Sequence, residues 1–366
     1  TGRTTMHWHW FHPFAAHAGQ GTVLLALAVL VALAVDRLWG EPPLRWHPVV
    51  WMGSALKLLG ERVAPSTPNT QNSKQFWLGA LAWCALAAIV FVASAVLQAL
   101  VLAVWGAPVT VCTAVVDMPG LALGETSVVI ATLRLLMAAL LLGVLLKPLL
   151  SFGFLVQEVR AVNAALDQSL EAGRERLSFL VSRDVAQLSA SEVRESAIES
   201  LAENLNDSVV APLFWFAVAG LPGAALYRMA NTADAMWGYR GMRGGRYWHW
   251  AGKWAARADD VLSWLPARIT ALLLVLPAPA QRLSALLREA HKTPSPNSGW
   301  PMAAMALALN VRLTKPGVYR LHGAGRSPTP LDARRARRLA GRMVQRLVAL
   351  AVLGLVLGCT MGRWYG

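Results

Sequence analysis

Charged side chains are scarce in this chain, which has 366 residues of which only 15% are Asp, Glu, Lys or Arg. Hydrophobic residues make up 55%, and the mean hydropathy is +0.44. A soluble domain of that composition could not bury all of its apolar surface, so an ordinary soluble fold is excluded. We expect the bilayer to be the main solvent of the chain.

The motifs of several common site classes are also missing. The three cysteines, Cys84, Cys112 and Cys359, stand singly in apolar stretches, so neither a zinc site nor a disulfide framework is predicted. No GxxxxGK(S/T) run occurs, nor a GxGxxG run after a strand, so these phosphate-binding loops are excluded. The excess of 34 Lys and Arg over 20 Asp and Glu suits lipid head groups or anionic substrates and does not indicate nucleic acid.

Long apolar runs dominate what is present. About 20 helical residues cross the hydrocarbon core of a bilayer, and four stretches are apolar over roughly that length. Two further apolar stretches, Val209 to Leu226 and Leu262 to Ala278, are broken by prolines and lie between basic segments, so we expect re-entrant or interfacial helices there. The four predicted spans run roughly from Thr22 to Leu38, Phe76 to Trp105, Thr126 to Leu150 and Met343 to Met361.

Lys and Arg are distributed unevenly between the loops. None occurs from Gly106 to Glu125, whereas the loops on either side contain several. Because Lys and Arg accumulate in cytoplasmic loops, we expect the 106–125 loop and both chain ends to lie outside. The predicted fold class is an all-α polytopic membrane bundle, one membrane-embedded domain over 1–366 with cytoplasmic segments at 151–207, 228–262 and 281–342.

Two cytoplasmic helices are predicted within residues 151–207. Apolar residues recur at helical spacing from Leu155 to Leu170, with charged residues on the other faces, which predicts one amphipathic helix. Ser189 followed by Glu192 is a capping-box pattern, which predicts the start of a second helix.

This second helix carries a stripe of carboxylates at intervals of four residues. Like charges at that spacing oppose a helix by about 0.2–0.5 kcal/mol per pair, so helix propensity does not explain the stripe. A solvated acidic face is the ordinary explanation, and a set of metal ligands is the alternative. The stripe consists of Glu195, Glu199, Glu203 and Asp207.

Further polar residues alternate with the proline-broken segments. Ionisable residues at membrane depth are costly unless they are paired or bind metal, so each is a functional candidate, the alternative being an Arg–Asp pair that fixes helix packing. If the chain is helical before Pro266, Arg257 and Asp260 are three residues apart and can pair, which leaves Asp259 free for substrate or metal.

Histidines occur in two places of interest. His47, between Trp46 and Pro48, is either a general base or a packed, hydrogen-bonded side chain. An N-terminal group could bind metal, but aromatic and His side chains at the membrane interface are the interpretation that we favour. That group consists of His7, His9, His12 and His17 beside Trp8, Trp10 and Phe11.

Six blocks of sequence, in order, carry a family resemblance: DRLWGEPPLRWHPVVWMG from Asp36, VSRDVAQL from Val181, ESAIESLAENLNDSVVAPLFW from Glu195, Tyr227 to Arg240, AARADDVLSWLPARITALL from Ala255, and SPNSGWPMAAMALAL from Ser295. Together they resemble the adenosylcobinamide-phosphate synthase family of cobalamin biosynthesis. The resemblance extends from about Asp36 to Arg326, and six ordered blocks are more specific than any single short motif.

The resemblance implies a multi-pass enzyme of the bacterial inner membrane. Such an enzyme joins a propionate carboxylate of adenosylcobyric acid to aminopropanol or its phosphate, with ATP and Mg²⁺, and the product is an amide. The bilayer and other enzymes of the pathway would be its further partners. The chemistry agrees with the acidic and basic residues, because a carboxylate must be activated before it acylates an amine, and nucleotide phosphates need Mg²⁺ held by carboxylates.

Site residues follow from the resemblance together with the patterns above. We expect catalytic roles for Glu199, Glu203, Asp259 and His47. Metal ligands would be Glu203, Asp207 and Asp36. Binding of substrate or nucleotide would fall to Arg183, Asp184, Asn204, Asn231, Asp234, Tyr239, Arg257 and Arg268.

Two other classes of function share some of these features. A transporter also has many spans, broken helices and buried charges, but the spans here show no internal repeat and the acidic residues gather on one side. A noncatalytic scaffold that binds corrinoid enzymes agrees with everything except the density of ionisable residues.

Overall fold

The computed structural model describes residues 12–68, 72–106, 125–181 and 183–365. These residues are almost entirely helical, with two short antiparallel hairpins and no larger sheet within the described ranges. The predicted all-α class is confirmed. His7 and His9 of the N-terminal histidine group lie outside the described residues, so its predicted interfacial position is untested.

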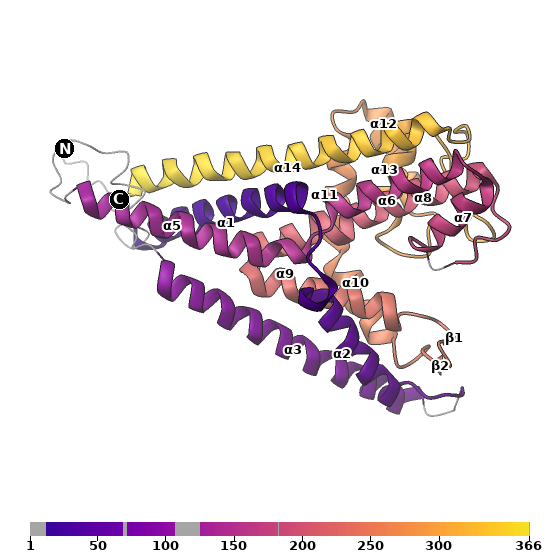
Figure 1. The fold of residues 1–366 in the computed structure, drawn as a ribbon, viewed down its shortest axis with the longest axis horizontal. Coiled ribbons are helices and arrows are strands. Elements are labelled where there is room, and N and C mark those ends of the chain that lie inside the picture. Colours follow the sequence, from indigo (N-terminus) through magenta and orange to yellow (C-terminus); the bar gives the residue numbers. More distant parts are fainter. Residues whose placement is uncertain (1–11, 69–71, 107–124, 182, 366) are drawn as a thin grey trace, which may run out of the picture.

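Four long helices form the extended part of the molecule. They are α1 (His12–Trp39), α3 (Asn72–Trp105), α5 (Glu125–Leu146) and α14 (Pro330–Tyr365). Helices α1, α3 and α14 each contain one of the predicted spans, whereas α5 covers the predicted span from Thr126 to Leu150 only as far as Leu146. Helix α1 packs against both α5 and α14. The start of α1 and the end of α14 lie together at one end of the molecule, where α3 ends and α5 begins (Figure 1).

The remaining elements lie mostly at the opposite end. The short helices before the acidic region are η1 (Leu44–Trp46), α2 (Pro48–Val63), η2 (Lys147–Leu149), α6 (Phe152–Leu166) and α7 (Leu170–Ser178). The others are α8 (Ala190–Leu205), the π-helical turn η3 (Asn206–Val210), α9 (Ala211–Trp237), α10 (Lys253–Leu262), α11 (Trp264–Val275), α12 (Ala280–Ala290) and α13 (Gly299–Leu309). The hairpins are β1 (Met242–Arg243) with β2 (Arg246–Tyr247), and β3 (Leu313–Lys315) with β4 (Tyr319–Leu321).

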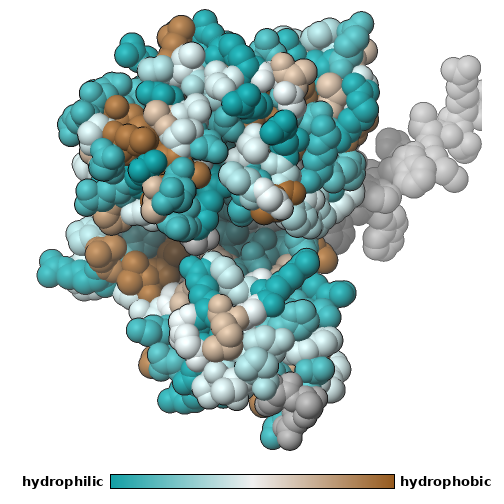
Figure 2. All heavy atoms as spheres, turned by 90° about the vertical axis from the view of Figure 1, so that its right-hand side faces the viewer, coloured by the Kyte–Doolittle hydropathy of each residue, from teal (hydrophilic) through white to brown (hydrophobic). Residues whose placement is uncertain are grey.

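Within the described residues, five helical segments are long and apolar enough to cross a membrane, which makes this a multi-pass membrane protein. The most apolar of these segments is α3. Large apolar side chains along α3, such as Leu81, Ile89 and Val92, are exposed, as expected of a surface that faces lipid. The opposite end of the molecule is mainly hydrophilic and is hollowed between an upper and a lower part (Figure 2).

The fifth segment, Ala190–Trp237, reverses its direction instead of continuing straight. The backbone leaves helical geometry at Ala219 and Gly220, and Gly220 has φ +65°. Arg228 donates hydrogen bonds to the Asp207 carbonyl at 3.1 Å and to Ser208 Oγ at 2.8 Å. Contact between residues about 20 apart requires two antiparallel arms, so the segment folds back on itself near Gly220. This geometry is compatible with the prediction of a re-entrant or interfacial helix at 209–226, which stays a prediction.

The second proline-broken stretch is too short to cross. Helix α11 has 12 residues, about 18 Å of helix, against a hydrocarbon core of about 30 Å. It packs against α13, and a loop leads from it to the amphipathic helix α12. The expectation of a non-spanning helix at 262–278 therefore agrees with the structure.

Two helix predictions at the hydrophilic end have different outcomes. The capping box is confirmed, because Glu192 accepts a hydrogen bond from the Ser189 amide and Ser189 Oγ accepts one from the Glu192 amide. The single amphipathic helix from Leu155 to Leu170 is wrong. Helix α6 ends at Leu166, and Ser169 caps the separate helix α7, since its hydroxyl offers the first turn a better partner than continued helix does.

The reversal at Gly220 predicts a marked sensitivity to substitution. A Cβ at this residue would lie 2.4 Å from Gln98 Oε1, and Gly220 combines φ +65° with ψ −156°, a conformation open essentially to glycine only. We expect Gly220→Ala to lower the free energy of unfolding by about 1–3 kcal/mol. Gln98→Leu should cost about 1–3 kcal/mol, because it removes the acceptor of the Leu221 amide, 2.7 Å away.

The measurement is the melting temperature of the purified protein in detergent. Gly241→Ala is the matched control, because no atom lies within 4 Å of the position that its Cβ would take, and the φ of Gly241 is not positive. Equal melting temperatures for Gly220→Ala and Gly241→Ala would contradict the tight reversal.

Candidate active site

A hollow of about 390 Å³ brings together the acidic residues of four separate elements. Helix α8 contributes Glu203, η3 contributes Asp207, α9 contributes Asp234, and α10 contributes both Asp259 and Asp260. We call these five residues the acidic hollow. Asn206, Gly238, Arg240, Ala256, Ser263, the 294–298 loop and Pro301 complete its walls.

The π-helical turn places Asp207 in the hollow. A π turn holds one more residue per turn than an α-helix and is frequent at functional sites. The buried side chain of Asn206 donates from Nδ2 to Asp207 Oδ1 at 2.8 Å, and its Oδ1 accepts from Thr270 Oγ1 at 3.3 Å. Asn206 therefore orients Asp207, and Thr270 on α11 holds Asn206 in place.

The returning arm of α9 supplies the opposite wall. Asn231 donates from Nδ2 to Asp259 Oδ1 at 3.3 Å, and its own Oδ1 accepts from Arg228 at 3.4 Å. Arg228 thereby connects the two arms of the segment, because it lies on the returning arm and donates to the Asp207 carbonyl on the entering arm. Through Asn231 it is also connected with Asp259 on α10. One buried guanidinium fixes three elements around the hollow without neutralising a carboxylate directly.

The 294–298 loop forms the third wall, and Arg268 holds it. The Arg268 guanidinium donates to Asn297 Oδ1 at 2.7 Å and to the Pro296 carbonyl at 3.2 Å. It also lies over the rings of Trp264 and Trp300, 4.4 and 4.7 Å from their centroids. Asn297 in turn donates to the Asp260 carbonyl at 2.7 Å. Arg268 thus supports the wall from behind and does not line the hollow.

The acidic hollow is short of positive charge. No ion pair within the described part of the chain reaches any of its five carboxylates, and Arg240 is the one basic residue among its lining residues. Burial, followed by the nearby Asp207 and Asp234 charges, raises the pKa of Asp259 well above its ordinary value. Burial also raises the pKa of Asp260, although Arg240 and Arg257 oppose the increase. The site therefore resists holding all of its negative charges at once.

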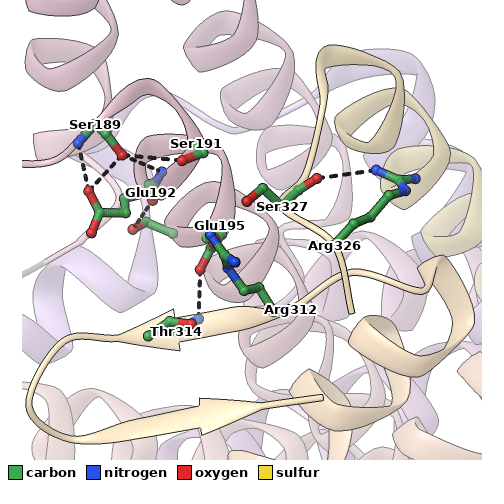
Figure 3. Close-up of polar contacts among 9 residues, drawn as sticks. Ser189, Ser191, Glu192, Glu195, Arg312, Thr314, Arg326 and Ser327 are labelled. Atoms are coloured by element: carbon green, nitrogen blue, oxygen red, sulfur yellow. Dashed lines mark hydrogen bonds and ion pairs between the residues drawn. The ribbon is translucent and has the colours of Figure 1, made fainter. Parts of the chain in front are cut away.

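The first half of the carboxylate stripe faces the β3–β4 hairpin instead. Glu195 accepts from the Thr314 amide at 2.9 Å and pairs with Arg312 at 3.3 Å (Figure 3). Glu199 accepts a hydrogen bond from the Tyr319 hydroxyl and lies 3.5 Å from Arg183. Burial and the Glu199 charge raise the pKa of Tyr319, so this hydroxyl stays protonated.

These contacts decide between the two interpretations of the stripe for its first half. Glu195 and Glu199 are only 1% and 7% exposed, so the interpretation of this half as a solvated acidic face is wrong. Glu203 and Asp207 face the hollow. The stripe therefore divides into a paired half and an unpaired half.

A separate buried cluster contains Asp36 and His47. Lys147 is only 3% exposed, and its Nζ lies 3.3 Å from Asp36 Oδ1 and 2.8 Å from Glu41 Oε2. His47 Nε2 lies 3.3 Å from the same Glu41 oxygen, and Asp36 Oδ2 accepts from the Gly153 amide at 2.8 Å. Lys147 and His47 together lower the pKa of Glu41 despite its burial. Neither Asp36 nor His47 lines the acidic hollow.

The other predicted binding residues are spread around these centres. Arg183 donates to Ser196 Oγ beside Glu199, and Asp184 is exposed and accepts from the Ala186 amide. Asn204 donates to the Ser200 carbonyl on its own helix. Tyr239 lies under the Arg243 guanidinium, 3.7 Å from its ring centroid.

The expected Arg257–Asp260 pair is wrong. Arg257 is exposed, and none of the ion pairs among the described residues joins the two side chains. Asp260 instead lines the hollow beside Asp259, because α10 presents both acids to it. The two acids therefore share an environment, and a purely structural role for Asp260 is not supported.

Several residues that organise the site escaped the sequence analysis. Lys147 ends an apolar run immediately before a proline, and a lone Lys in such a place is a signal that could have been used. Arg228 stands between Tyr227 and Met229, two residues after the predicted re-entrant segment 209–226, and carries a similar signal. Tyr319 had none, since its partner Glu199 is 120 residues away.

The donor set of the hollow fits a hard divalent cation. Mg²⁺ prefers oxygen ligands, keeps several waters, and is held by one or two carboxylates together with substrate phosphates. Within the described ranges, no three His, Cys, Asp or Glu side chains converge as direct ligands of one ion. A partly hydrated Mg²⁺ needs no such triple, and Asp207 with Asp234 would hold it.

Comparisons with known proteins cover most of the chain. A family model described as CobD/Cbib protein matches residues 29–351. The cobalamin biosynthesis protein CobD of Chromobacterium violaceum is 38% identical over 345 residues, 91% of this chain and 97% of that protein. The probable cobalamin biosynthesis protein CobD of Methanothermobacter thermautotrophicus is 37% identical over 300 residues, 80% and 84% of the two chains.

A third relative extends the range of organisms. The cobalamin biosynthesis protein CobD of Brucella suis is 35% identical over 310 residues, 80% of this chain and 83% of that protein. No solved structure shows significant similarity to the chain.

The raised pKa of Asp259 predicts how stability depends on pH. The folded protein keeps the Asp259 proton at pH values at which the unfolded chain has lost it, so folding becomes less favourable as pH rises from the ordinary Asp range toward the raised pKa. We expect Asp259→Asn, which cannot ionise, to melt at a higher temperature than the parent protein at pH 8 in EDTA. The difference should shrink near pH 4.

Melting temperatures in detergent across pH 4–8 provide the measurement. Asp184→Asn is the control, since Asp184 is exposed and lies outside the hollow. A parent protein and an Asp259→Asn variant with parallel pH profiles would show that Asp259 is not a buried, strained charge.

Proposed function

The chain belongs to the CobD/Cbib family, and we propose that it is an amide-forming ligase of cobalamin biosynthesis. It attaches (R)-1-amino-2-propanol phosphate, or aminopropanol itself, to a propionate carboxylate of adenosylcobyric acid, and ATP drives the reaction. The observation that carries the proposal is the acidic hollow, five carboxylates from four elements at the hydrophilic end of a membrane bundle. We expect this end to face the cytoplasm of a bacterial cell, where the nucleotide is available.

The hollow is matched to the reacting groups and not to the whole corrinoid. Its volume of about 390 Å³ is at the lower end of the range for small-molecule pockets. A propionate arm, an amino alcohol and a phosphate chain are of suitable size, while the corrin macrocycle would rest outside against the hollowed surface in Figure 2. This division keeps the bond-forming atoms beside the carboxylates.

Activation of the propionate requires phosphate chemistry. The propionate oxygen attacks a phosphorus of ATP and expels ADP from the γ-phosphorus or pyrophosphate from the α-phosphorus. The amine nitrogen then attacks the activated carbonyl carbon and gives up a proton to a base, and phosphate or AMP leaves with the former propionate oxygen. Mg²⁺, when bound by Asp207 and Asp234, would neutralise phosphate charge during these steps and would leave Asp259 free. Arg240 on the wall of the hollow would contact the phosphates from the other side.

Asp259 is the acid–base candidate in this arrangement. The amine must lose a proton as it attacks, and an efficient base has a pKa near the working pH. Burial moves Asp259 in that direction, and Asn231 fixes the carboxylate by its hydrogen bond. His47, the other candidate, is engaged with Glu41 in the Lys147 cluster, so we assign it to positioning.

Glu199 and Arg183 belong to the rim of the same site. Lys315 and Arg183 both lie within electrostatic range of Glu199, and Glu199 and Lys315 in turn act on Glu203. The β3–β4 hairpin therefore places cations beside the acidic hollow without occupying it. We assign Arg183 and Lys315 to holding an anionic group of the substrates, and Glu199 to positioning them.

The test is synthesis by the purified protein. Adenosylcobyric acid, aminopropanol phosphate, ATP and Mg²⁺ are supplied, and the new amide is followed by mass spectrometry. We expect product from the parent protein, and a loss of at least about 100-fold in Glu203→Gln and in Asp207→Asn, in line with the size of catalytic and metal-ligand contributions.

Glu192→Gln is the matched control for these two variants. Glu192 lies on the same helix, but its side chain caps the first turn, and Gln can serve the same capping box. It should retain near-parental activity, and all three variants should melt near the parental temperature. Full activity in Glu203→Gln and Asp207→Asn would remove the hollow from the mechanism, and absence of product from the parent protein would remove the proposed reaction.

A further inference from the structure

A second hollow, of about 300 Å³, lies on the first turns of α14, and arginines dominate its lining. Arg335, Arg338 and Arg342 line it together with Ala308, Leu309 and Leu339. It shares no lining residue with the acidic hollow. We call this the arginine hollow.

The three arginines share one face of α14. Their spacing of three and then four residues brings side chains to the same side of a helix. No ion pair within the described ranges involves Arg338 or Arg342. Arg335 lies 3.5 Å from Asp332, but Arg326 already holds both oxygens of that carboxylate, at 2.6 and 2.7 Å. The hollow therefore has a net positive charge.

Like charges surround the hollow as well. Arg337, on the next face of the helix, is close enough to Arg160, Arg334 and Arg338 for their charges to oppose its own. Helix α6, which carries Arg160, packs directly against α14. Arg160, Arg334, Arg337 and Arg338 have no ion pair among the described residues, so their charges oppose one another and an anion among them would relieve the repulsion.

The floor of the hollow and its place on α14 indicate the kind of anion. Leu309, Leu339 and Ala308 are apolar, which does not suit a small, fully hydrated ion. Leu353 and Val356 continue the arginine face, roughly 20° and 40° away from Arg342 around the helix, and both are about half exposed. Leu353 lies about 16 Å from Arg342 along the axis, a distance that an acyl chain spans.

We propose that the arginine hollow binds the phosphate of an anionic phospholipid, with the acyl chains along the Leu353 face of α14. Basic pockets at the ends of membrane helices recognise anionic head groups, and arginine forms paired hydrogen bonds with phosphate oxygens. A free phosphate has the same recognition chemistry, but it would gain nothing from the apolar floor or from the exposed face beyond it. The site anchors the end of α14 that carries the arginines at the membrane surface.

The experiment compares ligands on the full-length protein, purified in a neutral detergent and freed of lipid. Dioctanoyl phosphatidylglycerol, dioctanoyl phosphatidylcholine and inorganic phosphate are titrated separately, and native mass spectrometry and the melting temperature report binding. We expect phosphatidylglycerol to bind at least about tenfold more tightly than either of the others. Raising the salt concentration should weaken its binding.

The variant arm uses Arg338→Gln with Arg342→Gln. Each basic residue near an anionic lipid surface contributes about fivefold in affinity, so the double variant should lose about 25-fold for phosphatidylglycerol. Arg282→Gln with Arg288→Gln is the charge-matched control, because both arginines are exposed on α12 at the same end of the molecule. The control should bind like the parent protein.

Each contrary result has a definite meaning. Equal affinity for phosphatidylglycerol and phosphatidylcholine, or equal losses in the two double variants, would overturn the site. Inorganic phosphate that binds as tightly as phosphatidylglycerol would overturn the lipid as occupant. Should the double variant not fold, Arg338→Lys with Arg342→Lys replaces it, with an expected loss of paired recognition and weaker selectivity for phosphatidylglycerol.

Discussion

The meeting of several partly buried carboxylates in one place, with no ion pair to any of them among the described residues, is the constraint on which the arrangement of this protein depends. An unpaired charge in a low-dielectric environment is costly, and several of one sign cost more. Glu203, Asp207, Asp234, Asp259 and Asp260 meet in this way, and Asp259 shows the consequence in its raised pKa. Such an arrangement persists only where the rest of the fold fixes it and where a bound cation or substrate benefits from it.

The fold holds the acids in place by neutral Asn side chains, which donate to Asp207 and Asp259, and by hydrogen bonds to the backbone. Arg228 binds the Asp207 carbonyl rather than its carboxylate, and Asn297 binds the Asp260 carbonyl. Arg268 is occupied by the 294–298 loop and two tryptophans. The reversal at Gly220 makes this possible, because it returns α9 alongside the segment that carries Asp207.

Much of the fold was predictable because its signals are local. A run of about 20 apolar residues identifies a candidate span without knowledge of its neighbours, and prolines between basic flanks identified the segment that folds back on itself. Ser189 and Glu192 predicted the start of α8, because the capping box joins residues only three positions apart. The site was predictable in part, since Glu203, Asp207, Asp234 and Asp259 do meet. Pairings between residues far apart in the sequence were not predictable, for example those of Lys147 with Asp36 and of Tyr319 with Glu199. The prediction that Asp260 pairs with Arg257 while Asp259 faces the site was wrong. It relied on spacing within α10 alone, and that spacing does not show which other elements form the walls of the hollow.

The central claim is that the acidic hollow holds a divalent cation, and binding of Mn²⁺ in place of Mg²⁺ tests it most directly. The electron paramagnetic resonance signal of free Mn²⁺ is recorded during titration of the detergent-purified protein. The account predicts saturable loss of the free signal with the parent protein and with Glu192→Gln, and little loss with the Asp207→Asn, Asp234→Asn double variant. Undiminished binding by a folded double variant would contradict it.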